Sequence, residues 1–132
     1  MPDVRRPEDM NATFAVAFNT GRIEELLALY EPAALLVGEG EVHRRGLDAI
    51  RAELEGLLAL KGHMVSTNVY ALAVGKLAML SAEVLLEGRG PDGAPWRMES
   101  RTAEVVRQQE DGRWLYIIDH PTGARLGPPV SV

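Results

Sequence analysis

The stretch LAMLSAEVLLE, residues 77–87, alternates along its length between apolar residues and residues of mixed character. Every second residue from Ala78 to Leu86 is apolar, whereas Glu83 and Glu87 fall on the opposite face. A period of two is the period of a β-strand, in which neighbouring side chains point to opposite faces of the sheet. The stretch therefore predicts a strand with one buried face. A sheet made of such strands needs helices to cover that face.

Three further segments have strand composition and are joined to this one by short connections. The turn before residue 77 contains Gly75, and the turn before the last segment contains Gly112. A Gly/Pro-rich loop over residues 88–95 leads into the segment that follows residue 87. Hairpin-length connections join antiparallel neighbours, so we expect an antiparallel sheet. The additional strands are predicted at residues 64–74, 96–109 and 113–120.

Upstream of the sheet, apolar residues recur at helical spacing in three segments. The first helix opens at Pro7 and ends near Gly21, which can adopt the left-handed cap conformation. The second helix begins at Ile23 and is stopped by Pro32. The third helix runs from about Leu47 to Leu60, over residues 47–60. Short strands are expected between the second and third helices, at residues 33–37 and 42–45.

Helices first and strands afterwards indicate the α+β class. We expect three N-terminal helices packed on a curved antiparallel sheet, forming a cone that leaves space for a cavity. The chain has 132 residues, within the usual range for one domain. We therefore predict a single domain over residues 1–121. Residues 122–132, rich in Pro and Gly, are expected to form an irregular C-terminal tail.

Composition narrows the range of functions. The chain has 14 basic and 19 acidic residues, a net charge of -5, and its charges are interspersed. This pattern argues against a nucleic-acid partner, which needs a basic stripe. The absence of cysteine excludes disulfides and thiolate chemistry. The apolar runs are too short to span a bilayer and the first residues do not form a secretory signal, so we expect a cytoplasmic protein without membrane association.

The last hairpin carries the strongest chemical signal. A three-residue turn would pair Gln109 with Arg113 and place Glu104 opposite Ile118. Glu104 and His120 then become diagonal neighbours on one face, about 7–8 Å apart at the backbone. That face is otherwise mostly apolar and aromatic, so a carboxyl group there should have a raised pKa unless it is paired. The two residues are therefore candidates for a catalytic acid and base.

Other interpretations of this pair remain open. Glu104 and His120 could satisfy each other structurally, or a bulge could turn Glu104 to solvent. Asp119 is expected on the opposite face of its strand, holding a turn or lying near a dimer contact. The spacing Glu39-x-Glu41-x-His43 falls in a Gly-rich loop where acids are usually solvated, so we predict no metal site and no cofactor.

Several motifs in the chain are similar to those of a known family. The segment FAVAFNTG at residues 14–21 precedes IEELLALYEPAA at residues 23–34, and GLDAIR at residues 46–51 opens the third helix. The chain closes with DGRWLYIIDH at residues 111–120. Together these motifs resemble the SnoaL-like and ketosteroid-isomerase-like proteins of the nuclear transport factor 2-like superfamily, over about residues 10–121. The resemblance implies a cystatin-like cone, usually a homodimer, with a pocket between sheet and helices.

The resemblance carries over the catalytic residues of ketosteroid isomerases only in part. The tyrosine that donates to the oxyanion corresponds to Phe14, which has no hydroxyl group. The general-base aspartate falls near Gly38, which cannot take a proton. The second oxyanion donor falls near Glu104. Ketosteroid isomerisation itself is therefore not expected.

These observations leave more than one function open. We expect a protein that binds a small, mostly apolar molecule in a cone-shaped pocket. One alternative is a proton-transfer enzyme, an isomerase, cyclase or dehydratase, that uses Glu104 and His120. Another alternative is a non-catalytic dimerisation module. Apolar residues on both faces of residues 64–74 predict a homodimer through the outer sheet face. The ligand-binding residues are predicted to be Phe14, Tyr30, Trp96, Met98, Thr102, Trp114, Tyr116 and Ile118.

Overall fold

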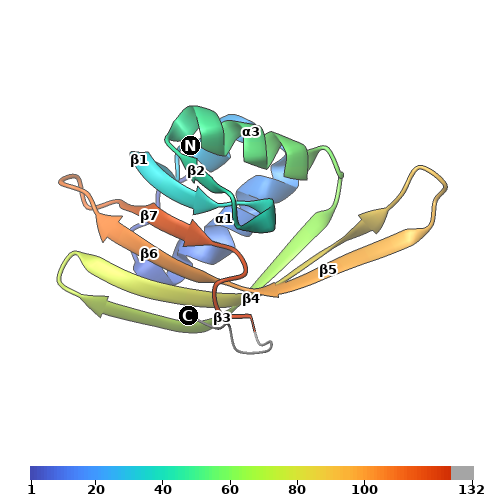
Figure 1. Ribbon diagram of the computed structural model, residues 1–132. Coiled ribbons are helices and arrows are strands. Elements are labelled where there is room, and N and C mark those ends of the chain that lie inside the picture. Colours follow the sequence, from blue (N-terminus) through green and yellow to red (C-terminus); the bar gives the residue numbers. More distant parts are fainter. Residues whose placement is uncertain (126–132) are drawn as a thin grey trace.

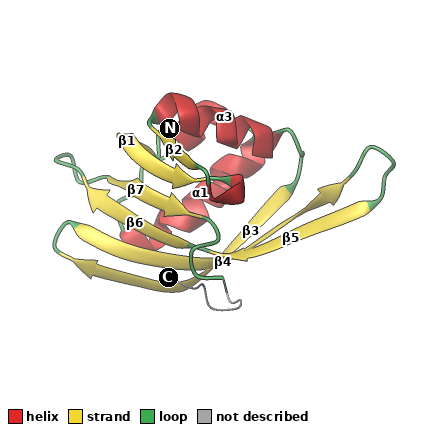
Figure 2. Cartoon of the chain, viewed as in Figure 1, coloured by secondary structure: helices red, strands yellow, loops and turns green. Residues whose placement is uncertain are grey.

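The computed structural model describes residues 1–125, and the predicted tail lies outside the described residues from position 126 onward. Helices cover one side of a curved sheet, as Figures 1 and 2 show. The helical elements are the short 3-10 helix η1 (Pro7–Asp9), α1 (Met10–Thr20), α2 (Ile23–Leu27), the 3-10 helix η2 (Glu39–Glu41) and α3 (Leu47–Leu58). The strands are β1 (Tyr30–Val37), β2 (His43–Arg45), β3 (His63–Val74), β4 (Leu77–Arg89), β5 (Pro95–Arg101), β6 (Ala103–Gln108) and β7 (Trp114–His120).

The α+β cone predicted from the sequence is confirmed, with one refinement of the sheet. Six of the seven strands follow the order β2-β1-β7-β6-β4-β3, and the seventh, β5, pairs with β4. All the neighbours pair antiparallel except β1 and β7, which run parallel. Hairpin-length connections predict the direction only of strands that follow one another in the chain. No such connection joins β1 to β7, so the sheet is mixed.

The predicted strand at residues 96–109 is divided by Thr102 into β5 and β6. Thr102 donates its backbone N–H to Ala82 O at 2.9 Å, so β4 continues as the partner across the break. Beyond this point the hairpin of β4 and β5 projects from the body of the protein as an arm, at the right of Figure 1. The predicted loop at residues 88–95 is accordingly shorter, because both strands extend into it.

The second predicted helix is also shorter than expected. α2 ends at Leu27, and β1 begins at Tyr30, so that Pro32 lies inside a strand. The apolar residues of the segment fit either structure, and the backbone pairing of Tyr30 with Tyr116 favours the strand. Among the described residues, no helix is long and apolar enough to cross a membrane.

The core lies between the helices and the inner face of the sheet. The alternation predicted for β4 is confirmed, since Ala78, Leu80 and Leu86 are buried and Glu83 and Glu87 are exposed. The helices contribute some of the most deeply buried side chains, which are Met10 in α1, Leu26 in α2 and Ile50 in α3.

An amide side chain fixes α1 against the first long strand. Asn19 donates Nδ2–H to Met64 O at 2.9 Å and accepts the Met64 N–H on Oδ1 at 2.8 Å. The side chain thus replaces a strand neighbour at the start of β3, where both backbone groups of Met64 would otherwise need partners. This contact sets the position of α1 along the sheet.

Candidate functional site

A bulge in β7 determines which side chains of the last hairpin point inward. Val106 pairs with Tyr116, but Val105 pairs with Ile118, so Ile117 is an extra residue on β7. A bulge of this kind interrupts the alternation of side chains, because two residues oppose one. The residues of β7 that follow Ile117 therefore face the side opposite to the one predicted from simple alternation.

The predicted pairing is confirmed at the turn and wrong beyond the bulge. Glu104 lies opposite Asp119 rather than Ile118, and His120 lies opposite Ala103. Glu104 and His120 are therefore not the diagonal neighbours that the sequence predicts. Glu104 is 4% exposed and Asp119 is 6% exposed, so both carboxyl groups are in the interior. The prediction that Asp119 lies on the outer face is also wrong, because a shift of one residue reverses the facing of side chains.

The interior carboxyl groups are held by side chains from three different elements. Asn11 in α1 donates Nδ2–H to Glu104 Oε1 at 3.0 Å, and Tyr116 donates its hydroxyl to Asn11 Oδ1 at 2.6 Å. Tyr30 in β1 donates its hydroxyl to Asp119 Oδ2 at 2.5 Å. We call Glu104 and Asp119 the carboxyl pair. Every hydrogen bond in this set is buried, so each orients its partner without competition from water.

Burial, and to a smaller extent the negative charge of nearby Asp119, raise the pKa of Glu104 to about 8. Hydrogen bonds from Thr102 and Asn11 act in the opposite direction, because they stabilise the ionised form. At neutral pH the Glu104 carboxyl therefore keeps its proton and can donate it.

Burial also raises the pKa of Asp119, to about 6, although the hydrogen bond from Tyr30 and the electrostatic effect of His120 lower it. At neutral pH the pair then holds one proton, with Glu104 as the acid and Asp119 as the base. Two carboxyl groups whose surroundings separate their pKa values are a common arrangement for acid–base chemistry. Ion pairs inside structural cores also produce such shifts.

An aromatic cluster fills the interior beside the carboxyl pair. The ring centroids of Tyr30 and Tyr116 are 5.0 Å apart, and Phe14 packs edge-on to both at 6.5 and 6.0 Å. Tyr30 and Tyr116 are buried, and Phe14 is half-buried. Burial raises the pKa of both phenols well above the ordinary value, so they remain hydrogen-bond donors at neutral pH.

The other predicted binding residues are divided between the interior and the surface. Thr102 and Trp114 are buried, and Trp96 is half-buried against the core. Met98 is 51% exposed because the arm carries it away from the helices, and Ile118 is 40% exposed because the bulge turns it outward. The prediction that Met98 and Ile118 wall the same interior space is therefore wrong.

His120 lies at the rim of the site rather than inside it. Its Nε2 is 3.2 Å from Glu41 Oε2, and Glu41 belongs to η2 in the connection between β1 and β2. A Cβ on Gly123 would come within 2.8 Å of His120 Nδ1, so the chain after β7 passes close to the imidazole. His120 thus bridges the end of β7 to η2, next to Asp119.

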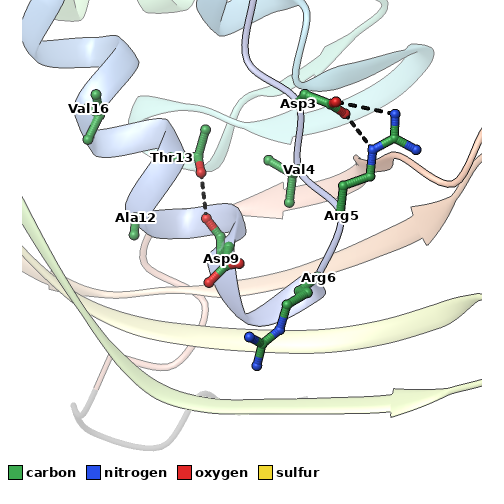
Figure 3. Close-up of a pocket in the computed structure, with 8 residues that line it drawn as sticks. All are labelled: Asp3, Val4, Arg5, Arg6, Asp9, Ala12, Thr13 and Val16. Carbon is green, nitrogen blue, oxygen red and sulfur yellow. Dashed lines mark hydrogen bonds and ion pairs between the residues drawn. The ribbon is translucent and has the colours of Figure 1, made fainter.

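Two of the hollows on the surface of residues 1–125 are the best formed, and neither is lined by the carboxyl pair. The first, of about 430 Å³, lies between the N-terminal segment and α1 (Figure 3). Its charged residues satisfy nearby groups, as in the ion pair of Arg5 Nε with Asp3 Oδ1 at 2.9 Å. The second, of about 760 Å³, lies between the end of α3 and the arm. The carboxyl pair is therefore enclosed in the core and does not form the floor of either hollow.

Two residues of the site were not identified from the sequence. Asn11 shares a helical stripe with Phe14 and Phe18, three and seven residues later, and a polar residue on an apolar face is a usable signal. Asp119 was missed because Ile117 and Ile118 are both apolar, and nothing in that pair of residues marks a bulge.

The family model described as SnoaL-like domain matches residues 11–117. No curated protein matches the chain.

Solved structures match the fold over most of the chain. A ketosteroid isomerase-like protein from Erwinia carotovora atroseptica is 15% identical, with a TM-score of 0.76, over 86% of this chain and 90% of that chain. A proposed dehydratase from the NTF2-like family of Streptomyces avermitilis is 19% identical, with a TM-score of 0.71, over 86% and 90%. A proposed calcium/calmodulin-dependent protein kinase type II association domain from Thiobacillus denitrificans is 17% identical, with a TM-score of 0.74, over 91% and 96%. At these identities the likeness is one of fold alone.

Proposed function

This chain belongs to the SnoaL-like domain family, and we propose that it binds a small, mostly apolar molecule beside the carboxyl pair and transfers a proton to or from it. The family and the fold suggest small-molecule binding or an isomerase-like function in general terms. The observation that carries the finer proposal is the position of Glu104 directly opposite Asp119 in an apolar interior. The sequence predicts His120 as the catalytic partner of Glu104, and we now propose Asp119 in its place.

The proposed chemistry needs one group that accepts a proton and one that donates a hydrogen bond. The Asp119 carboxylate removes a proton from a carbon next to a carbonyl group of the bound molecule. The protonated Glu104 carboxyl donates to the carbonyl oxygen as negative charge develops on it. The proton on Asp119 then returns to another carbon, which isomerises the molecule and restores the pair.

The surrounding residues would have supporting roles in this reaction. Tyr30 holds the Asp119 carboxylate, and Asn11 holds the Glu104 carboxyl in place. Phe14 is the half-buried member of the aromatic cluster, so we expect a ligand to enter by displacing its ring. The apolar character of the cluster favours a ligand without charge.

The first test measures the two pKa values directly. Carboxyl ¹³C resonances should show Glu104 titrating above pH 7 and Asp119 titrating below it. The pKa of Glu104 should fall in Asp119→Asn, because the neighbouring negative charge is removed. Asp92→Asn, in the turn of the arm, is the matched control. A Glu104 carboxyl that titrates at its ordinary pKa would remove the proposed acid.

The second test measures the reaction on simple probes. Small cyclic ketones in D₂O should exchange their α-protons faster with the protein than in buffer, by at least about 100-fold for a positioned acid and base. Glu104→Gln and Asp119→Asn should each lose this acceleration, whereas Glu41→Gln, at the rim, should retain most of it. Equal exchange by the native protein and both variants would contradict the proposal.

A second candidate function is self-association through the outer face of the sheet. Leu72, Met79, Val105 and Ile118 are successive neighbours across β3, β4, β6 and β7, and form one row that we call the outer apolar row. Leu72 is 61% exposed and Met79 is 52% exposed. A self-complementary row of this kind favours a two-fold homodimer, in which each copy covers the other.

A further inference from the structure

The hollow between α3 and the arm lies well away from the carboxyl pair. Its volume of about 760 Å³ is within the range of small-molecule sites. Met98 in its lining pairs with Leu86, whereas Glu104 pairs with Leu80, six residues away along β4. At about 3.3 Å per residue, the two places are about 20 Å apart along the strand. We call this hollow the arm groove.

In the apolar wall of the arm groove, the Trp96 indole packs closely over two glycines. A Cβ on Gly62 would lie 2.7 Å from Trp96 Cη2, and a Cβ on Gly88 would lie 2.8 Å from Trp96 Cζ2. Only glycine therefore fits at either position beside the indole as it lies here. Met98 and Leu60 are exposed in the same lining and extend the apolar surface.

The charged residues that line the arm groove are all basic. They are Lys61, Arg89 and Arg97, in a chain whose net charge is -5. Arg97 Nη2 is 3.2 Å from Glu99 Oε1, and Arg89 donates to Gly93 O at 2.8 Å, so both guanidinium groups are partly engaged. Arg97 also lies opposite Glu87 across β4, so its charge is balanced locally, and Lys61 is the member of the lining that would attract an anion.

Lys61 has an unusual backbone conformation at this place. Its φ is 56°, in the left-handed region that residues other than glycine seldom adopt. This conformation ends α3, because Lys61 donates its backbone N–H to Leu58 O at 3.0 Å in a left-handed helix cap. The cap fixes the backbone of Lys61 at the edge of the arm groove.

We propose that the arm groove binds a small amphipathic anion, a monocarboxylate with an aliphatic chain. The chain would lie on Trp96 and Met98, and the carboxylate would be held by Lys61. The indole, packed over Gly62 and Gly88, offers a flat apolar surface at little cost in conformational entropy. Lys61 selects for the negative head group, and the open groove admits the ligand without rearrangement of the core.

Decanoate, kept below its micellar concentration, is the probe for this site. Binding should produce saturable shifts of the Trp96 indole N–H resonance and of the Gly62 and Gly88 amides. Decanol should bind about tenfold more weakly, and decyltrimethylammonium should cause no shift at these positions. Lys61→Gln should lower the affinity for decanoate about tenfold. Arg22→Gln, which changes an exposed arginine beside α2, is the matched control and should leave the affinity unchanged.

Three results would overturn the proposal. The first is equal binding of decanoate and decyltrimethylammonium, and the second is an unchanged decanoate affinity in Lys61→Gln. The third is binding to phosphatidylglycerol vesicles without binding of free decanoate, which would indicate a membrane contact instead. Because the readout is at Trp96, about 20 Å from the carboxyl pair along β4, failure here is distinguishable from failure of the proposed proton transfer.

Discussion

A carboxyl group is accommodated in an apolar interior at low free-energy cost only while it is neutral. Glu104 meets this condition at neutral pH, because burial and the charge of Asp119 both raise its pKa. Asp119 bears the remaining negative charge, which the Tyr30 hydroxyl and the His120 imidazole favour. The pair therefore holds one proton near neutrality, and loss of the Glu104 proton should destabilise the fold.

The pH dependence of stability follows from the sign of the Glu104 shift. Its pKa is raised from 4.5 to about 8, so the native state binds this proton more tightly than the unfolded chain does. The resulting contribution to the free energy of unfolding is complete below pH 4.5 and is lost as the pH rises toward 8. Glu104→Gln removes the ionisation. We expect it to be more stable than the native protein at pH 9 by roughly 2 to 4 kcal/mol, and nearly equal at pH 4.5.

Urea unfolding followed by tryptophan fluorescence at the two pH values measures this difference. Glu55→Gln, on the exposed surface of α3, is the control and should follow the native protein at both. A Glu104→Gln variant that loses the same stability as the native protein between pH 4.5 and pH 9 would show that Glu104 is not the group responsible.

At the scale of the element, the sequence predicts well what depends on regular periodicity. The alternation in β4 predicts correctly which of its residues face the core. It also places Glu104 on the inner face of β6, because β4 pairs with the chain both before and after Thr102. The position of Asp119 is not predicted, because the bulge at Ile117 depends on packing across β6 and not on a local signal. The site could therefore be predicted only in part, because the inward position of Asp119 depends on the single bulge residue Ile117.

Helix and strand limits were predicted less well where an apolar segment suits both. β1 begins at Tyr30, although the segment before it has the leucine spacing of a helix. The strand forms because it pairs with β7, which is distant in the sequence. Pairing with a remote strand is invisible to an argument from neighbouring residues. As a result the role of Tyr30 was predicted only as a pocket wall, whereas it donates to Asp119.

Two glycines provide a matched test of packing within the elements. Gly88→Ala in β4 should destabilise the protein by about 1 to 3 kcal/mol, because the new methyl group would lie 2.8 Å from the Trp96 ring. Gly56→Ala in α3 meets nothing within 4 Å and should instead stabilise the protein by about 0.5 to 1 kcal/mol. Denaturant midpoints measure both changes. A neutral Gly88→Ala would mean that the indole can move aside.

At the scale of the whole molecule, helices cover one face of the sheet and leave the other face exposed. The inner face is packed against α1 and α3, whereas the outer apolar row has no cover within the described part of the chain. The row crosses four neighbouring strands, so its partner would have to be a broad, flat surface. A second copy of the same sheet has that shape.

Met79→Asp should therefore abolish self-association, because a two-fold interface would place the new charge on both copies. Sedimentation velocity at micromolar concentration should show a dimer for the native protein and a monomer for the variant. Val16→Asp changes an apolar residue on the exposed side of α1, which is 66% exposed, and should remain a dimer. A native protein that sediments as a monomer would refute the dimer.

The parallel pairing of β1 with β7 has a consequence for synthesis on the ribosome. Tyr30 pairs with Tyr116, so the N-terminal part of the chain obtains its sheet neighbour only when the last strand has emerged. Until then, the tyrosine and the apolar residues around it stay exposed in the nascent polypeptide. Contacts between distant residues slow the final step and leave such a chain open to misassembly, so a chaperone that shelters early segments should raise the yield of the finished protein.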